Sequence, residues 1–249
     1  MFPATSKVEF MKNIINQIIF NLSVYPLVIV FLMFSGCGRK NSINNITTDN
    51  FIYPVHNDIT VTVFWIGEPS GPDNNYIPND VSAWDERWQD HYGGVDDPDN
   101  RNGYNPSAFT PKENPFYFAL PYNDFDINGL RKQNAAANIY WWAEKIWSDS
   151  ESSCKNRWIK ITKDSLIAYA QWEDVGPNET NDINYVFGNS LPINSFNAGA
   201  GLDVSPAVET YLGLTGVDTI SWQFIEEADV PGGPWKQIIT ASQISRLNK

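Results

Sequence analysis

The chain has 249 residues, of which 42% are hydrophobic, 14% aromatic and 18% charged, and its formal net charge is −12. This composition allows one sizeable buried core and excludes a wholly disordered chain. No Lys/Arg-rich run is present, which argues against a nucleic-acid partner, and two Cys with two His are too few for a Cys/His zinc site or a disulfide-stapled scaffold. We therefore expect no metal and no cofactor.

Residues 1–36 have the pattern of a secretory signal peptide. Lys12 precedes an uncharged, mostly apolar stretch, and Ser35 and Gly36 supply the small residues of a cleavage site directly before Cys37. The end of this stretch resembles a bacterial lipobox, which implies lipidation of Cys37, with palmitate among the acyl chains, and removal of everything before it. An uncleaved membrane anchor is the alternative. In both cases we expect an exported chain held at a membrane, and Gly38 after the cysteine favours the outer membrane, facing the periplasm.

The part of the chain after the signal is expected to form one domain. Residues 38–50 are polar and aperiodic, so we assign 37–56 to the lipidated cysteine and a polar tether. Residues 57–249 contain no second linker and form the domain. Once Cys37 carries lipid, Cys154 has no partner for a disulfide, and we expect it to be inert.

Short strands dominate the predicted elements. Alternating β-branched and aromatic residues predict strands over 59–66, 115–120, 157–162, 165–172, 220–226 and 235–240. Residues 67–114 are rich in Gly, Pro, Asn and Asp without periodicity, which predicts a long loop of the kind that carries function or covers a site. Helical spacing of apolar residues predicts a helix over 134–147, with Trp142 toward the core and Trp141 nearly opposite. A second, short helix begins at Ser205-Pro206 and ends at Gly213.

Two segments together resemble a known family. Residues 168–177 (AYAQWEDVGP) run from a strand into D-x-G-P, and residues 201–214 (GLDVSPAVETYLGL) place an Asp and a Ser before a helix that ends in Leu-Gly. In this order they resemble the signatures of double-psi β-barrel domains, which rare lipoprotein A proteins, expansins and related endoglucanases share. The resemblance implies a mainly β fold, a six-stranded double-psi β-barrel with a long loop insertion and a few short helices.

The resemblance also points to two carboxylates as catalytic candidates. Asp174 stands where the lytic members have a catalytic Asp, and Asp203 is the second candidate. Glycan cleavage generally needs one carboxylic acid as proton donor and often a second carboxylate. A turn or capping role is the alternative for both, and for Asp203 we favour it, because the charge would be stabilised near the start of a helix.

The chain departs from the family at two positions. Tyr117 occupies the place of the lipoprotein A histidine, and Val175 replaces the usual Arg of D-R-G-P. Binding of a polysaccharide without hydrolysis, as in expansins, therefore stays open beside cleavage, and Tyr117 becomes a candidate substrate-binding residue.

Further binding candidates come from aromatic and polar residues near these motifs. Trp141 and Trp172 offer flat apolar faces of the kind that stack on sugar rings, although burial in a satellite cluster is the alternative. Asp85 ends a Ser-Ala-Trp-Asp run that partly matches a Tyr-Trp-Asp motif of the related endoglucanases. His91 could fold over the cleft or stay solvated. The acidic run at 96–99 departs from a calcium loop at several ligand positions, so we predict a solvated turn.

The sequence thus predicts an envelope lipoprotein whose barrel cleft binds cell-wall glycan, namely peptidoglycan. Cleavage by a lytic transglycosylase-like or glycosidase-like mechanism through Asp174 is the catalytic form of this prediction. The alternative is a non-catalytic lipoprotein scaffold that docks on other envelope proteins. The oligomeric state is not predicted.

Overall fold

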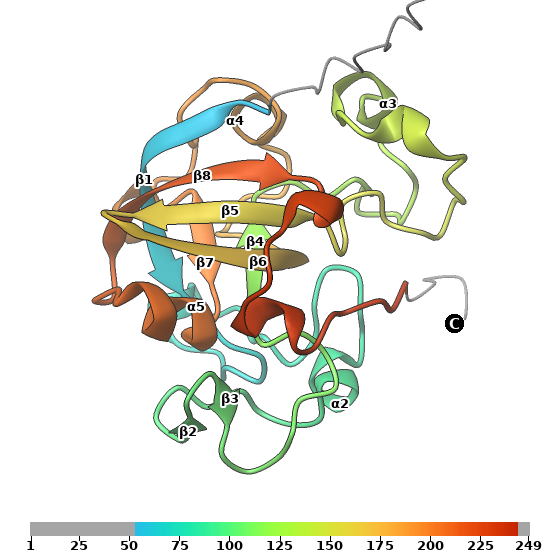
Figure 1. The fold of residues 1–249 in the computed structure, drawn as a ribbon. Coiled ribbons are helices and arrows are strands. Elements are labelled where there is room, and N and C mark those ends of the chain that lie inside the picture. The colour runs from blue at the N-terminus through green and yellow to red at the C-terminus, as the bar shows by residue number, and fades with distance from the viewer. Residues whose placement is uncertain (1–52, 244–249) are drawn as a thin grey trace, which may run out of the picture. The chain divides into compact units, whose positions relative to one another are not determined.

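Six strands close into a barrel (Figure 1). The computed structural model describes residues 53–243, so the predicted signal peptide, Cys37 and most of the predicted tether lie outside the described residues. In barrel order the strands are β1 (Val55–Val63), β7 (Leu202–Val204), β4 (Tyr117–Leu120), β6 (Leu166–Val175), β5 (Trp158–Lys163) and β8 (Asp218–Ile225). The predicted mainly β fold with a six-stranded barrel and a few short helices is confirmed. β1 starts within the segment assigned to the tether.

The strand pairing has an internal two-fold pattern. The pairs β1/β7 and β4/β6 are parallel, and the other four neighbouring pairs are antiparallel. Exchanging β1 with β6, β4 with β7 and β5 with β8 reproduces the same set of neighbours. The chain therefore forms the barrel from two halves of three strands each, although no repeat is visible in its sequence.

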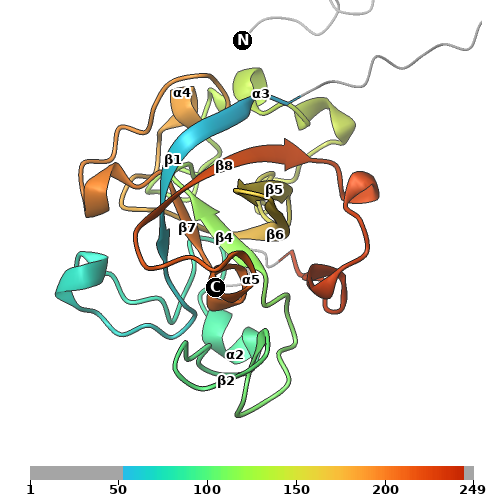
Figure 2. The same cartoon turned by 60° about the vertical axis from the view of Figure 1, so that its left-hand side comes forward.

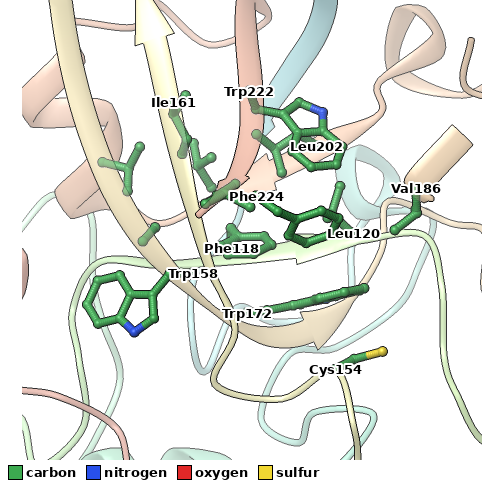
Figure 3. Close-up of a cluster of buried hydrophobic side chains, with 14 of the residues drawn as sticks. Phe118, Leu120, Cys154, Trp158, Ile161, Trp172, Val186, Leu202, Trp222 and Phe224 are labelled. Atoms are coloured by element: carbon green, nitrogen blue, oxygen red, sulfur yellow. The ribbon is translucent and has the colours of Figure 1, made fainter. Parts of the chain in front are cut away.

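The barrel interior is packed with large apolar side chains (Figure 3). Along β8 the burial alternates, so that Ile220, Trp222 and Phe224 point inward and their neighbours point toward solvent. Phe118 of β4 stacks on Trp172 of β6 with ring centroids 5.9 Å apart. This alternation is what a strand with one buried face requires, and aromatic residues are among the largest side chains in the interior.

The long segment between β1 and β4 packs on the outside of the barrel (Figures 1 and 2). It contains a 3-10 turn η1 (Pro72–Asn74), the helix α2 (Trp88–Tyr92) and a small sheet of β2 (Arg101–Asn102) and β3 (Asn105–Pro106). A second apolar cluster joins it to the barrel and consists of Phe64, Ile66, Trp88, Tyr92, Tyr117 and Ala119. We refer to residues 64–116 as the insertion.

The helix predicted over 134–147 is wrong. The structure has the short helix α3 (Ala135–Asn138), an extended residue at Ile139 and a 3-10 turn η2 (Trp142–Glu144). Trp141, not Trp142, is buried, and its indole nitrogen donates to the Ser153 carbonyl at 2.6 Å. Aromatic residues have modest helix propensity, so this buried contact overrides the helical spacing.

The strand predicted over 235–240 is also wrong. Its start forms the 3-10 turn η5 (Pro234–Lys236), and its backbone is paired by side chains instead of by a neighbouring strand. Asn114 Nδ2 donates to the Trp235 carbonyl, while the Gln171 amide exchanges two hydrogen bonds with the backbone of Thr240. Hydrogen bonds from side chains in distant parts of the chain therefore take the place of the strand-to-strand backbone hydrogen bonds that the alternation predicted.

The remaining helical segments are short. They are α4 (Ile183–Val186), α5 (Pro206–Leu212) and the 3-10 turns η3 (Asn197–Gly199) and η4 (Glu227–Asp229). The predicted start of α5 is confirmed, since Ser205 Oγ accepts from the Val208 amide and Gly213 ends the helix in the left-handed region. Between residues 53 and 243, no helix has the length and apolar character needed to cross a bilayer.

Candidate functional site

One row of residues across three strands brings the two predicted aspartates together. Ala119 of β4 pairs with Asp203 of β7 on one side and with Asp174 of β6 on the other. Residues paired across a sheet point to the same face, so both carboxylates emerge beside the small Ala119 side chain. They line one pocket of about 290 Å³ on the outside of the barrel.

A β-bulge turns Asp174 toward this pocket. Phe118 pairs with Trp172, but the next residue, Ala119, pairs with Asp174, so Glu173 is the extra residue in β6. Without the bulge, alternation would point Asp174 into the barrel beside Trp172. Glu173 instead faces Lys155, whose Nζ atom lies 2.5 Å from its carboxylate, and both side chains are buried. Glu173 therefore has different surroundings from Asp174.

Asp174 is buried and is held by the backbone. Its Oδ1 accepts a hydrogen bond of 2.7 Å from the Ala83 amide of the insertion. Burial raises the pKa of Asp174 to about 7, and the negative charge of Asp203 adds to the rise, while the backbone hydrogen bonds oppose it. The pKa of this carboxyl group therefore lies much closer to neutral pH than that of an exposed aspartate.

Asp203 lies on β7 and is partly buried. Its Oδ1 accepts a hydrogen bond from the Thr62 hydroxyl of β1. Burial again raises the pKa of Asp203 to about 7, with a further contribution from the charge of Glu68. Glu68 lines the same pocket, accepts from Asn79 Nδ2 at 2.7 Å, and has a raised pKa because it is buried. A Cβ at Gly176 would lie 3.4 Å from Asp203 Oδ2, so the glycine leaves the space beside this carboxylate open.

The walls of the pocket combine aromatic and amide side chains. Phe64, Trp65 and Ile77 supply apolar surface, and the side chains of Asn74, Asn79, Asn178 and Asn197 supply donors and acceptors. Four carboxylic side chains line it, namely Glu68, Asp73, Asp174 and Asp203, while the lining contains no Lys, Arg or His. Such a pocket can hold an uncharged or positively charged ligand through stacking and hydrogen bonds, and it repels anions.

None of the five predicted substrate-binding residues lines the pocket, and three of them, Tyr117, Trp172 and Trp141, are buried elsewhere. The Tyr117 hydroxyl donates to Asp96 at 2.8 Å and accepts from the Ile66 amide, beneath the insertion. Trp172 is inside the barrel, where its indole nitrogen donates to the Asp174 carbonyl at 2.7 Å. Trp141 is buried in the main apolar cluster. Of these, Trp172 touches the backbone of a pocket residue.

Asp85 and His91 lie next to each other in the insertion. His91 Nδ1 is 2.7 Å from Asp85 Oδ2, and the Asp85 side chain is buried while that of His91 is partly exposed. Neither residue lines the pocket. The turn that begins at Ser82 nevertheless reaches it, because it contains the Ala83 amide that binds Asp174.

The prediction of a solvated acidic turn at 96–99 is wrong for Asp96. This residue is fully buried, and Arg101 Nη1 lies 2.6 Å from its Oδ1. Across residues 53–243, no group of three or more His, Cys, Asp or Glu side chains could hold a metal ion. Cys154 is a free, buried thiol, and burial raises its pKa well above the usual value.

Sequence reasoning missed Thr62, Trp65 and Glu68 as pocket residues. Thr62 reaches Asp203 only through the parallel pairing of β1 with β7, across 141 residues of sequence. Glu68 stands two residues after the end of the predicted strand 59–66, and this polar residue near a strand end was the one local signal available.

Comparisons with known proteins identify no family for this chain. No family model matches the chain, and no curated protein matches its sequence. Among solved structures, the chain is similar to the Streptomyces papain inhibitor, with 12% identity and a TM-score of 0.28 over 70% of this chain and 97% of the inhibitor. A likeness of this weakness says nothing about what the chain does.

Proposed function

We propose that the pocket around Asp174 and Asp203 binds cell-wall glycan, with peptidoglycan as the natural ligand. The observation that carries the proposal is a pair of carboxyl groups, the buried Asp174 and the partly buried Asp203, each with a pKa of about 7, flanking one pocket that has an aromatic wall. Carboxyl groups with raised pKa in a cleft are typical of functional sites, because keeping them buried has a cost in stability. Trp65 provides the face for a sugar ring, and the asparagine amides match its hydroxyl groups.

The double-psi family assignment is part of this proposal. The two signature aspartates of the sequence motifs flank a single residue of β4, and the six strands pair with an internal two-fold pattern. Both features are expected of a double-psi barrel of the rare lipoprotein A and expansin type.

The same pair of carboxyl groups suits glycosidic cleavage. The protonated member would donate its proton to the glycosidic oxygen as the C–O bond breaks. The ionised member would take the proton from the attacking hydroxyl, which belongs to water or to the sugar itself, as the new C–O bond forms. Asp174 is the candidate acid because it is held by backbone amides alone, whereas Asp203 is bound to Thr62. If cleavage is absent, the pocket acts as an expansin-like binder.

The charge of the pocket restricts which part of the wall it accepts. A lining with four carboxylic side chains and no cationic one disfavours the carboxylates of peptide stems. We therefore propose that the pocket holds the neutral face of the sugar backbone.

The location of the protein remains a proposal from the sequence. Cys37 lies outside the described residues, and we propose that it carries the lipid that anchors the chain to the outer membrane. Metabolic labelling with palmitate tests this: the label enters the wild-type chain and is lost in Cys37→Ser.

The non-catalytic scaffold is the second candidate, and one observation favours it. Ile127 and Leu130 are exposed, at 101% and 65%, on the rim of a separate hollow of about 980 Å³. Exposed apolar side chains beside a hollow are a feature of docking surfaces. This alternative predicts no affinity for the wall itself.

Co-sedimentation with purified sacculi separates the two candidates. We expect the full chain to sediment with sacculi, and Trp65→Ala to reduce binding at least tenfold, because it removes the stacking face. Trp147→Ala is the matched control, since Trp147 is also partly exposed but lies outside the pocket lining. Equal losses in both variants, or no binding by the wild type, would contradict the proposal.

A further inference from the structure

A short turn of the insertion provides the backbone amide that binds Asp174. Ser82 Oγ accepts hydrogen bonds from the amides of Trp84 and Asp85, and the Ser82 amide donates to the Asp85 carbonyl. These bonds fix the backbone on both sides of Ala83. The Ala83 amide then points at Asp174 Oδ1, which lies 2.7 Å away and 91 residues later in the chain.

Two aromatic side chains attach this turn to the barrel. The Trp84 ring packs against Trp172 with centroids 5.8 Å apart, and its indole nitrogen donates to Asn123 Oδ1. Trp88, in the following helix α2, packs against Tyr117 at 5.4 Å. The segment therefore contacts both β6, which carries Asp174, and the neighbouring strand β4.

The buried side chain of Asp85 makes polar contacts within the segment 82–91. Asp85 accepts from the Arg87 amide at 2.9 Å through Oδ1, and its Oδ2 lies 2.7 Å from His91 Nδ1. Asp85 is 1% exposed, so its carboxylate depends on these partners. Neither Asp85 nor His91 lines the pocket, and a direct role with the ligand is not what this geometry provides.

We propose that residues 82–91 are a positioning element for Asp174. They hold its Oδ1 atom in place through the hydrogen bond from the Ala83 amide. Ser82 and Asp85 are the positioning residues, since they shape the turn without contacting the pocket. The purpose of this element rests on the proposed function, but the contact exists without any ligand.

The contact can be tested by NMR on the full chain without adding glycan. A pH titration follows the Asp174 carboxyl carbon and the Ala83 amide proton. In the wild type both signals should titrate with one midpoint near pH 7, because the amide donates to the titrating group. A hydrogen bond to a carboxylate favours its ionised form, so weakening the turn should raise this midpoint by about one pH unit.

Two variants weaken the turn in different ways. Ser82→Ala removes the hydroxyl without changing charge. Asp85→Ala removes the carboxylate that contacts the Arg87 amide and His91. Both should raise the Asp174 midpoint and uncouple the Ala83 amide from it, while Ser82→Thr restores the wild-type behaviour. Asp90→Ala is the matched control for Asp85→Ala, since it removes the same charge from an exposed position in the middle of helix α2.

The direction in which the Asp174 midpoint moves distinguishes a positioning role of Asp85 from a purely electrostatic one. If Asp85 acted only through its negative charge, its removal would lower the Asp174 midpoint, and the proposal would be overturned. It would also be overturned if the variants lost thermal stability while both signals kept the wild-type midpoint. Since no ligand is present, a failure of glycan binding leaves this test unaffected.

Discussion

Replacing Asp174 by Asn should stabilise the fold in a pH-dependent way. The Asn side chain keeps an oxygen for the Ala83 amide but has no proton to lose. In the wild type the pKa of Asp174 rises from 3.8 to about 7 because the carboxyl group is buried. An acid with a raised pKa in the folded state makes folding less favourable as pH rises between the two pKa values, since the unfolded chain has already released its proton.

The size of the effect follows from the same values. Each pH unit between about 4 and 7 lowers the free energy of unfolding of the wild type by about 1.36 kcal/mol, a total of about 4 kcal/mol. Two of these units lie between pH 5 and pH 7. The stability of Asp174→Asn relative to wild type should therefore be about 3 kcal/mol more favourable at pH 8 than at pH 5.

Urea unfolding at pH 5 and pH 8, followed by tryptophan fluorescence, measures this difference. Comparing the two pH values removes any constant effect of the substitution on packing. Asp90→Asn, at an exposed position, serves as the control and should show no such difference. A relative stability that is the same at both pH values, or lower at pH 8, would refute the reasoning that Asp174 is buried with a raised pKa.

Three further predictions concern buried groups outside the pocket. Lys155→Met leaves the Glu173 carboxylate buried without its partner, and should lower the free energy of unfolding by about 3–5 kcal/mol at pH 8. The loss should be smaller at pH 5, where Glu173 takes up a proton, and equal losses in urea unfolding at the two pH values would contradict this. Tyr117→Phe removes the hydroxyl that binds Asp96 and should lower stability by about 1–3 kcal/mol in the same assay; a loss near zero would count against the contact. With the other cysteine replaced by serine, Cys154 should react with a thiol reagent only as the protein unfolds, and rapid reaction without denaturant would show that it is accessible.

The barrel was predictable because its strands carry strong local patterns. Alternation along 59–66 and 220–226 marks one buried face, and both regions form strands that lie next to each other in the barrel. The break in the helix over 134–147 was not predictable, because it depends on Trp141 reaching the carbonyl of Ser153. The predicted strand at 235–240 is likewise absent, because side chains of Asn114 and Gln171, far along the chain, bind the backbone of Trp235 and Thr240.

The candidate site likewise has one part that was predictable from the sequence and one part that was not. Asp174 and Asp203 stand in local motifs, so the sequence could single them out, and their role stays a prediction. Their convergence depends on Ala119 lying between them and on the bulge at Glu173, which are properties of strand register. Glu68 joins them only because β1 pairs with β7 at the other edge of the same row.

The most direct test of the account is the analysis of products released from purified sacculi by the full chain, using mass spectrometry, beside Asp174→Asn. We predict that the wild type binds sacculi and releases glycan fragments with reducing or anhydro-sugar ends, and that these fragments disappear in the variant. Binding without products would keep the glycan ligand and remove the catalytic step. If the wild type neither binds sacculi nor releases products, the central claim that the pocket around Asp174 is a site for cell-wall glycan is contradicted.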